Sequence, residues 1–218
     1  MAVAPTVART SRPARTRWQT IARRIRVPLG FVVAAVFLVF AKPTAQTLAW
    51  SLPLVLAGLW LRGYAAGYVK KNAELTRTGP YAYTRNPLYL GSMSIAFGFA
   101  VAAGRWPLGV LLVALLLAIY LPTILSEEAF LRSAFPGFDA YAKQVPRLLP
   151  RLTAAHFPDT VSSGGRFSRE RYLHHREYNA LMGATAIYVA FGFRAALGSH
   201  LSWDVVWATP ALRALLRH

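Results

Sequence analysis

The feature that most constrains this chain is a series of long apolar segments without a single charged residue. Three of these runs, Pro43–Leu61, Asn86–Gly104 and Trp106–Ser126, have the length of about 20 residues that a helix needs to cross a bilayer. Two others, Val27–Ala41 and Tyr178–Phe193, are shorter. Charged residues make up 15% of the chain, against roughly a quarter in soluble domains. The pattern therefore predicts an all-α, polytopic membrane helix bundle with about five transmembrane helices.

The positive charge of the chain is concentrated at its N-terminus and in particular loops. The net charge of +17 would by itself suit a nucleic-acid partner. However, residues 1–26 contain seven arginines and the first acidic residue is Glu74, an arrangement that follows the positive-inside rule and suits an anionic leaflet. We therefore predict a basic cytoplasmic arm and no nucleic-acid partner. A signal peptide with Leu29–Ala41 as its apolar core is the weaker alternative, because three more spans follow and no clear cleavage site ends this run.

The charges in the loops predict which segments share one side of the membrane. Lys42 and Arg105 are the lone charges in two of the turns, whereas the segments 67–91 and 126–151 are rich in lysine and arginine. The positive-inside rule places both basic segments in the cytoplasm. The predicted organisation is a basic arm at 1–26, a membrane domain at 27–197 and an interfacial tail at 198–218, with helices at about 27–41, 45–66, 87–104, 106–125 and 178–197.

One of these segments, TGPYAYTRNPLYLG at Thr78–Gly91, has two compatible interpretations. Asn86 is a preferred N-cap and Pro87 suits the first helical position, so the segment can simply begin a membrane helix, with its tyrosines in an interfacial aromatic belt. The free N–H groups and the dipole of a helix N-terminus also form a site for a carboxylate or a phosphate. The residues alone leave both interpretations open.

The other segment begins with Glu127 and Glu128, the first acidic residues after an apolar run. They can occupy the first turn of a short cytoplasmic helix, where acids are favourable. Alternatively they mark a site, because carboxylates at a membrane boundary are costly unless they are paired or solvated. Adjacent helical residues point about 100° apart, so at most one of the two is expected to face a given pocket. The proline-stiffened tail at 145–151 can fold back over Thr78–Gly91.

Together the two segments resemble the superfamily of isoprenylcysteine carboxyl methyltransferases and phospholipid methyltransferases, which are integral membrane enzymes. The resemblance rests on GPYAYTRNPLYLG, on the Glu127-Glu128 pair and on the later Phe135-Pro136-Gly137, Tyr141 and Val145-Pro146-Arg147. It covers roughly residues 45–151 and implies S-adenosylmethionine as the cofactor, bound in a cytoplasmic pocket. The residues that the resemblance places at the cofactor are Lys70, Glu74, Leu75, Thr76, Gly79, Tyr81, Asn86, Pro87, Leu88, Tyr89, Gly91 and Glu127.

Two departures from the family pattern affect the methyl acceptor more than the cofactor. Asn86 stands in place of the family histidine, and Thr123 stands in place of an arginine that binds the substrate of isoprenylcysteine enzymes. The second departure argues against a prenylcysteine carboxylate as the acceptor without excluding it. A lipid amine, a small thiol and another lipophilic molecule are the other candidates, and membrane lipids are expected partners.

The chemistry of the candidate residues also suits this cofactor. A helix N-terminus with Asn86 suits its carboxylate, Glu127 suits its ammonium group or its ribose, and Tyr81 and Tyr89 suit its adenine or its sulfonium. Glu128 is the candidate catalytic residue, as a general base for an acceptor that must lose a proton.

Two functions of other kinds remain open on the sequence. One is an NADPH-dependent membrane reductase of similar helical architecture, and the other is a non-enzymatic transporter or scaffold whose tyrosines and glutamates only anchor helices. No metal site is predicted, because the adjacent His174 and His175 do not share a helical face and the chain contains no cysteine. The oligomeric state does not follow from the sequence.

Overall fold

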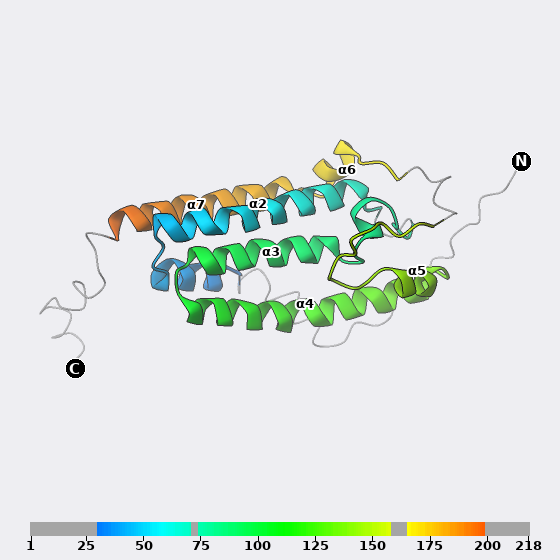
Figure 1. Cartoon of the computed structure of the whole chain (residues 1–218), viewed down its shortest axis with the longest axis horizontal. Coiled ribbons are helices and arrows are strands. Elements are labelled where there is room, and N and C mark those ends of the chain that lie inside the picture. Colours follow the sequence, from blue (N-terminus) through cyan, green and yellow to red (C-terminus); the bar gives the residue numbers. More distant parts are fainter. Residues whose placement is uncertain (1–29, 71–73, 158–164, 199–218) are drawn as a thin grey trace, which may run out of the picture.

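The computed structural model describes residues 30–70, 74–157 and 165–198, and this part of the chain contains helices and no β-strand (Figure 1). The helices are Gly30–Phe40, α2 (Ala45–Tyr68), the 3-10 helix η1 (Gly79–Ala82), α3 (Pro87–Ala102), α4 (Trp106–Ala134), α5 (Phe138–Gln144), α6 (Arg169–His174) and α7 (Tyr178–Leu197). The predicted basic arm at 1–26 and all of the predicted tail beyond Gly198 lie outside the described residues.

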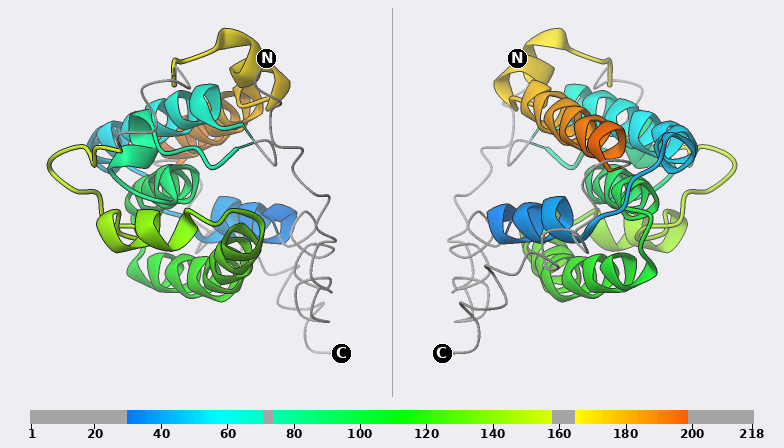
Figure 2. Two further views of the ribbon diagram at one scale, coloured as in Figure 1. Left: turned by 90° about the vertical axis from the view of Figure 1, so that its right-hand side faces the viewer. Right: turned by 90° about the vertical axis from the view of Figure 1, so that its left-hand side faces the viewer.

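Three of the described helices, α2, α4 and α7, are long and apolar enough to cross a membrane. The helix Gly30–Phe40 and α3 are apolar but shorter. In Figure 1 the helices α2, α3, α4 and α7 run side by side, while η1, α5 and α6 gather at one end, which we call the motif end. Figure 2 views the molecule along the bundle and shows α2, α3, α4 and α7 end-on, packed beside one another. The prediction of an all-α membrane bundle is confirmed, with three helices of full spanning length among the described residues.

Helices α2 and α3 approach each other closely because glycines lie where their backbones meet. A Cβ atom at Gly58 would lie 2.5 Å from the carbonyl oxygen of Gly91, and a Cβ atom at Gly91 would lie 2.8 Å from that of Gly58. Small residues at such positions allow membrane helices to pack backbone against backbone. Gly91, which the sequence placed at the cofactor, thus has a packing role between two helices.

Replacing Gly58 with alanine tests this contact. The new methyl group meets a backbone oxygen, which cannot move without shifting α3, so we expect Gly58→Ala to lower the free energy of unfolding by about 1–3 kcal/mol. Equilibrium unfolding in mixed micelles measures the change. Gly183→Ala in α7 is the matched control, because no atom lies within 4 Å of its added Cβ and alanine favours a helix. An equal response in both variants would contradict close packing at Gly58.

Helix α4 continues well past the end of the apolar run and past the predicted end at residue 125. It carries both glutamates inside its last turns and ends at Ala134. Of the two interpretations of Glu127 and Glu128, the one that places them in the first turn of a short separate helix does not hold. The physical reason is that residues 127–134 are good helix formers, while Phe135 precedes a proline and adopts an extended conformation (φ −130°, ψ 109°) that ends the helix.

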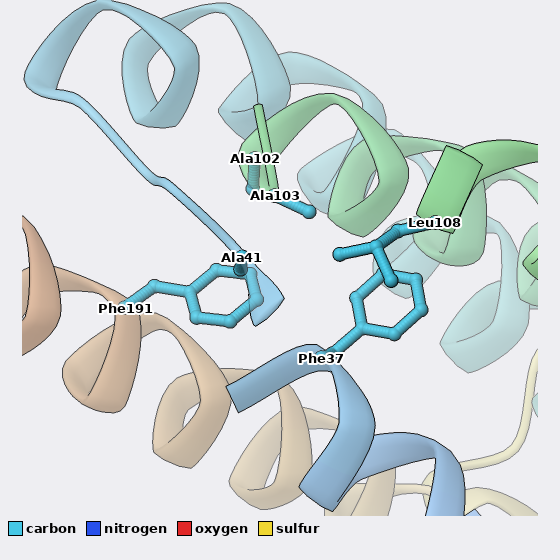
Figure 3. Packing of buried hydrophobic residues seen from close by; sticks show 6 residues of the cluster. All are labelled: Phe37, Ala41, Ala102, Ala103, Leu108 and Phe191. Atoms are coloured by element: carbon cyan, nitrogen blue, oxygen red, sulfur yellow. The ribbon is translucent and has the colours of Figure 1, made fainter. Parts of the chain in front are cut away.

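The end of the bundle opposite the motif end is closed by a small apolar core. Buried residues from four helices and the turns between them form it: Phe37, Ala41, Ala102, Ala103, Leu108 and Phe191. Figure 3 shows the rings of Phe37 and Phe191 pointing into this cluster. The guanidinium of Arg194 in α7 donates to the carbonyl oxygens of Ala41 (2.7 Å) and Val39 (2.8 Å), which fixes the C-terminus of the helix Gly30–Phe40. The first helix is thus tied to α7 at this end.

Candidate active site

Glu128 is the centre of a buried ionic network at the motif end. Only 4% of its surface is exposed, and both carboxylate oxygens accept hydrogen bonds from Arg147 at 2.9–3.1 Å. The guanidinium of Arg85 lies 3.5 Å from the same carboxylate, and the amide of Asn86 donates to it at 3.4 Å. These contacts join α4 to the loop before α3 and to the segment after α5. A carboxylate with so many donors, buried at the end of a membrane helix, holds three parts of the site together.

The segment 145–155, which we call the strap, runs along the residues that precede α3. Backbone N–H groups donate across this contact from Arg85 to Pro146, from Arg151 to Tyr83 and from Ala155 to Ala82, each at 2.9 Å. The hydroxyl of the buried Thr84 lies within hydrogen-bond distance of the carbonyl oxygens of Arg147 (3.2 Å) and Leu148 (3.1 Å). The prediction that the proline-stiffened tail folds back over Thr78–Gly91 is therefore confirmed.

A second apolar core supports the strap and η1. It contains the buried residues Phe138, Tyr141, Val145, Ala155 and Phe157, and Leu75 packs against it. The hydroxyl of Tyr141 donates to the carbonyl oxygen of Tyr81 at 2.8 Å. Burial raises the pKa of both phenols above their ordinary value and thus further favours the neutral hydroxyl, the form in which Tyr141 donates this hydrogen bond. Tyr81 and Leu75, two of the residues predicted at the cofactor, are thus part of the packing that shapes the loop.

Glu127 and Tyr89 form the accessible part of the site. The hydroxyl of Tyr89 donates to Glu127 at 3.0 Å, and Glu127 is exposed while Glu128 beside it is buried. The ring of Tyr89 meets that of Tyr120 edge to face, with centroids 5.2 Å apart and planes at 69°. The predicted divergence of the two glutamates along the helix is confirmed. A carboxylate and two aromatic rings, one from α3 and one from α4, are therefore presented together.

The start of α3 differs in one respect from the sequence interpretation. Asn86 occupies the N-cap position and Pro87 the first helical position, but the side chain of Asn86 makes no capping hydrogen bond. It donates instead to the carbonyl oxygen of Arg147 (3.0 Å) as well as to Glu128. The side chain is used for tertiary contacts because the strap and α4 offer it buried acceptors.

The remaining predicted residues form a separate group near the end of α2. Lys70 and Glu74 make an ion pair at 2.8 Å, and the backbone N–H of Lys70 donates to the hydroxyl of Thr76 at 3.2 Å. Gly79 adopts a left-handed conformation (φ 60°), and a side chain there would strike the ring of Tyr68. These residues shape the turn into η1.

Sequence reasoning missed a second ion pair, partly buried, between Arg62 in α2 and Glu177 just before α7. The guanidinium contacts both carboxylate oxygens at 2.8–3.0 Å and also donates to the hydroxyl of Ser92 and to the carbonyl oxygen of Leu88. A sequence signal existed, because Arg62 is a charged residue within a membrane helix and such residues usually have a partner. That partner lies 115 positions away, so no local pattern identifies it.

Comparison with known proteins identifies the family. The family model described as phospholipid methyltransferase matches residues 29–137, half of the chain. The chain belongs to the phospholipid methyltransferase family. Both glutamates, Tyr89 and Tyr120 lie inside the matched residues, whereas the strap, α6 and α7 lie beyond them. The pair of Glu128 and Arg147 therefore links the family region to the segment that follows it.

Three curated relatives are similar over less than half of their length. The nickel-cobalt-cadmium resistance protein NccN of Alcaligenes xylosoxydans xylosoxydans is 35% identical over 95 residues, which cover 44% of each chain. The cobalt-zinc-cadmium resistance protein CzcN of Cupriavidus metallidurans is 34% identical over 44% of this chain and 43% of its own. The protein-S-isoprenylcysteine O-methyltransferase of Schizosaccharomyces pombe is 32% identical over 103 residues, 47% of this chain and 44% of its own. No solved structure matches.

The family membership and the apolar helices together make this an integral membrane protein of a methyltransferase family. Among residues 30–70, 74–157 and 165–198, no group of three histidines, cysteines, aspartates or glutamates is arranged to hold a metal ion.

Proposed function

We propose that this member of the phospholipid methyltransferase family transfers a methyl group from S-adenosylmethionine to a lipophilic acceptor, with its N-terminus and its site on the cytoplasmic side. The observation that carries this proposal is the Tyr89–Glu127 pair, which lies beside Tyr120 at one end of an apolar cavity in the bundle. A cofactor held by the pair and an acceptor held in the cavity would meet at Tyr120. Family membership favours this function over the NADPH-dependent reductase and over the transporter or scaffold.

The residues at the accessible end of the site have the chemistry that this cofactor requires. When bound, S-adenosylmethionine supplies an electrophilic methyl group on a sulfonium cation. Glu127 would hold the ammonium group, and the faces of Tyr89 and Tyr120 would attract the sulfonium with roughly 0.5–2 kcal/mol. The turn that contains Lys70, Thr76 and Gly79 would border the cofactor as the family pattern implies. Alignment and exclusion of water are the main contributions that a protein makes to such a displacement.

Glu128 fits a positioning role better than the role of general base that the sequence suggested. Both of its oxygens accept hydrogen bonds from Arg147, and Arg85 and Asn86 lie at the same carboxylate. Its side chain is buried, whereas a base must reach the acceptor. Glu128 would therefore act by holding the strap against the loop before α3, and through that loop by orienting the first turn of α3 with Tyr89.

The cavity supports a lipophilic acceptor. Its volume is about 340 Å³, within the range of ligand-binding pockets, and almost all of the side chains around it are apolar. Thr123, which stands where isoprenylcysteine enzymes have an arginine, donates its hydroxyl to the carbonyl oxygen of Ile119 at 2.6 Å. Thr123 supplies no positive charge for a carboxylate, so the cavity and the family membership are what support a lipophilic acceptor.

Binding of S-adenosylhomocysteine to the purified protein in detergent tests the cofactor site. We expect the wild type to bind S-adenosylhomocysteine and not NADPH. We expect Tyr89→Phe and Glu127→Gln each to weaken this binding by roughly tenfold or more, because Tyr89→Phe removes the hydrogen bond to the Glu127 carboxylate and Glu127→Gln removes the negative charge. Isothermal titration calorimetry measures the affinities.

Two conservative variants serve as matched controls for this experiment. Tyr178→Phe and Glu170→Gln change the same groups at exposed positions on α7 and α6. Their affinity should equal that of the wild type. Wild-type affinity in both site variants would overturn the assignment of the site, and stabilisation by NADPH alone would favour the reductase.

A further inference from the structure

The apolar cavity is a partly open hollow between the helix Gly30–Phe40, α3, α4 and α7. Four helices contribute to its lining, and among the described residues Ser92 and Tyr120 are the two with polar side chains on it. A cavity of this composition binds the apolar part of a ligand by the hydrophobic effect and binds a polar head where its polar groups lie. The placement of these two groups therefore orients whatever occupies the cavity.

Both polar groups lie at the end of the cavity that faces the motif end. Ser92 is in the second turn of α3 and accepts a hydrogen bond from Arg62, which is paired with Glu177. Tyr120 packs against Tyr89, whose hydroxyl donates to Glu127. Ser92 thus contacts an ion pair, and Tyr120 contacts a tyrosine that is hydrogen-bonded to a carboxylate. The polar end of the cavity and the proposed cofactor site are continuous through Tyr120.

The other end of the cavity is closed. Phe37, Phe99, Leu112 and Phe191 line it there, and Phe37 and Phe191 belong to the buried core that Figure 3 shows. Phe37 and Phe191 are 5% and 0% exposed, so their rings are packed by their neighbours and form the floor of the cavity at this end.

The depth of the cavity follows from the helices that line it. Eight residues separate Tyr120 from Leu112 along α4, and at 1.5 Å per residue this corresponds to about 12 Å. C–C bonds of about 1.5 Å in a zigzag chain each advance about 1.25 Å, so an extended chain of about ten carbons has this length. The volume of about 340 Å³ is at the low end for ligand pockets, which suits one such chain and not a lipid with two long chains.

We propose that this cavity selects the acceptor by the length of its apolar chain, admitting a single chain of about ten carbons, straight or isoprenoid, whose reacting head lies between Ser92 and Tyr120. Phe37 and Phe191 set the length limit. Each added carbon buries one more methylene and improves binding by about fourfold until the chain meets the floor. Beyond that length further carbons must stay outside the cavity, and affinity stops rising. The orientation of the head toward the methyl donor rests on the proposed function, whereas the length limit does not.

Photolabelling with alkyl amides of six to sixteen carbons, each with a diazirine at the end of the chain, tests the limit without a methyl donor. The measured quantity, in lipid nanodiscs, is the part of the labelling that an excess of unlabelled decanamide abolishes. We expect it to rise about fourfold with each added carbon up to about ten carbons and then to level off or fall. The mapped sites should be at the floor, on Phe37, Phe99 and Phe191.

Two variants move the limit in opposite directions, and a third leaves it in place. Ala96→Leu places a larger side chain on the lining and should shift the best chain two or more carbons shorter. Phe37→Ala should shift it longer. Ala118→Leu, on the exposed face of α4, should leave the best chain length unchanged. If Phe37→Ala fails to fold, the comparison of Ala96→Leu with Ala118→Leu still tests the limit. Labelling that rises through sixteen carbons, or an optimum that Ala96→Leu does not move, overturns the proposal.

The two proposals fail separately. Normal binding of S-adenosylhomocysteine without a chain-length limit would overturn this inference and leave the proposed function intact. A chain-length limit in a protein that does not bind S-adenosylhomocysteine would support the cavity and overturn the proposed function.

Discussion

Replacing Glu128 with alanine is expected to lower the free energy of unfolding by about 3–5 kcal/mol, the largest effect of any single substitution considered for this protein. The reason is that the substitution removes the carboxylate beside the largely buried guanidinium of Arg85 and one of the two acceptors of the Asn86 amide. Arg147 also loses its three charge-assisted hydrogen bonds to this carboxylate. Equilibrium unfolding in mixed micelles measures the loss.

The neighbouring glutamate provides the matched control for Glu128. Glu127→Ala removes the same group one position earlier on the same helix, but the side chain is exposed, so we expect a loss below about 1 kcal/mol. Arg147→Ala should fall between the two, because its side chain is 44% exposed and Arg85 still neutralises Glu128. Equal losses for Glu127→Ala and Glu128→Ala would contradict the structural role that we give to the ionic network.

The two glutamates also show how far the sequence predicts this site. Their divergence follows from helical geometry, and their position after an apolar run follows from hydropathy. Which of them is buried does not follow, because it depends on Arg147, 19 positions away, and on how the residues after α4 return to the loop before α3. The prolines at 146 and 150 predicted an extended strap but not its hydrogen-bonding partners.

Helix ends show the same division between local and tertiary causes. The start of α3 was predicted from Asn86 and Pro87, since both preferences act within one turn. The end of α4 was missed because hydropathy marks where the apolar run stops, whereas helix propensity carries the helix on until the residue before Pro136. Asn86 was placed correctly as an N-cap, but its side chain bonds to partners that only the folded chain provides.

The ion pair between Arg62 and Glu177 joins residues 115 positions apart and supports the second prediction. Replacing Arg62 with alanine is expected to lower the free energy of unfolding by about 2–4 kcal/mol, slightly less than for a fully buried pair, because 22% of the arginine side chain is exposed. The loss has two parts. Glu177, with a side chain only 11% exposed, is left without its partner, and Ser92 and the carbonyl oxygen of Leu88 lose a donor at the polar end of the cavity.

A double-mutant cycle separates the ion pair from these other contacts. Because replacing both partners removes the uncompensated charge, Arg62→Met with Glu177→Leu should be less destabilising than Arg62→Met alone. Arg132→Met with Asp139→Leu is the matched control, since that pair at 2.7 Å is exposed and should couple by less than about 1 kcal/mol. Additive losses at Arg62 and Glu177 would mean that α7 is held against α2 by its other contacts, which are apolar packing and the hydrogen bond between Ser51 and Tyr188. Strong coupling would mean that the pair fixes the position of α7, and with it one wall of the cavity.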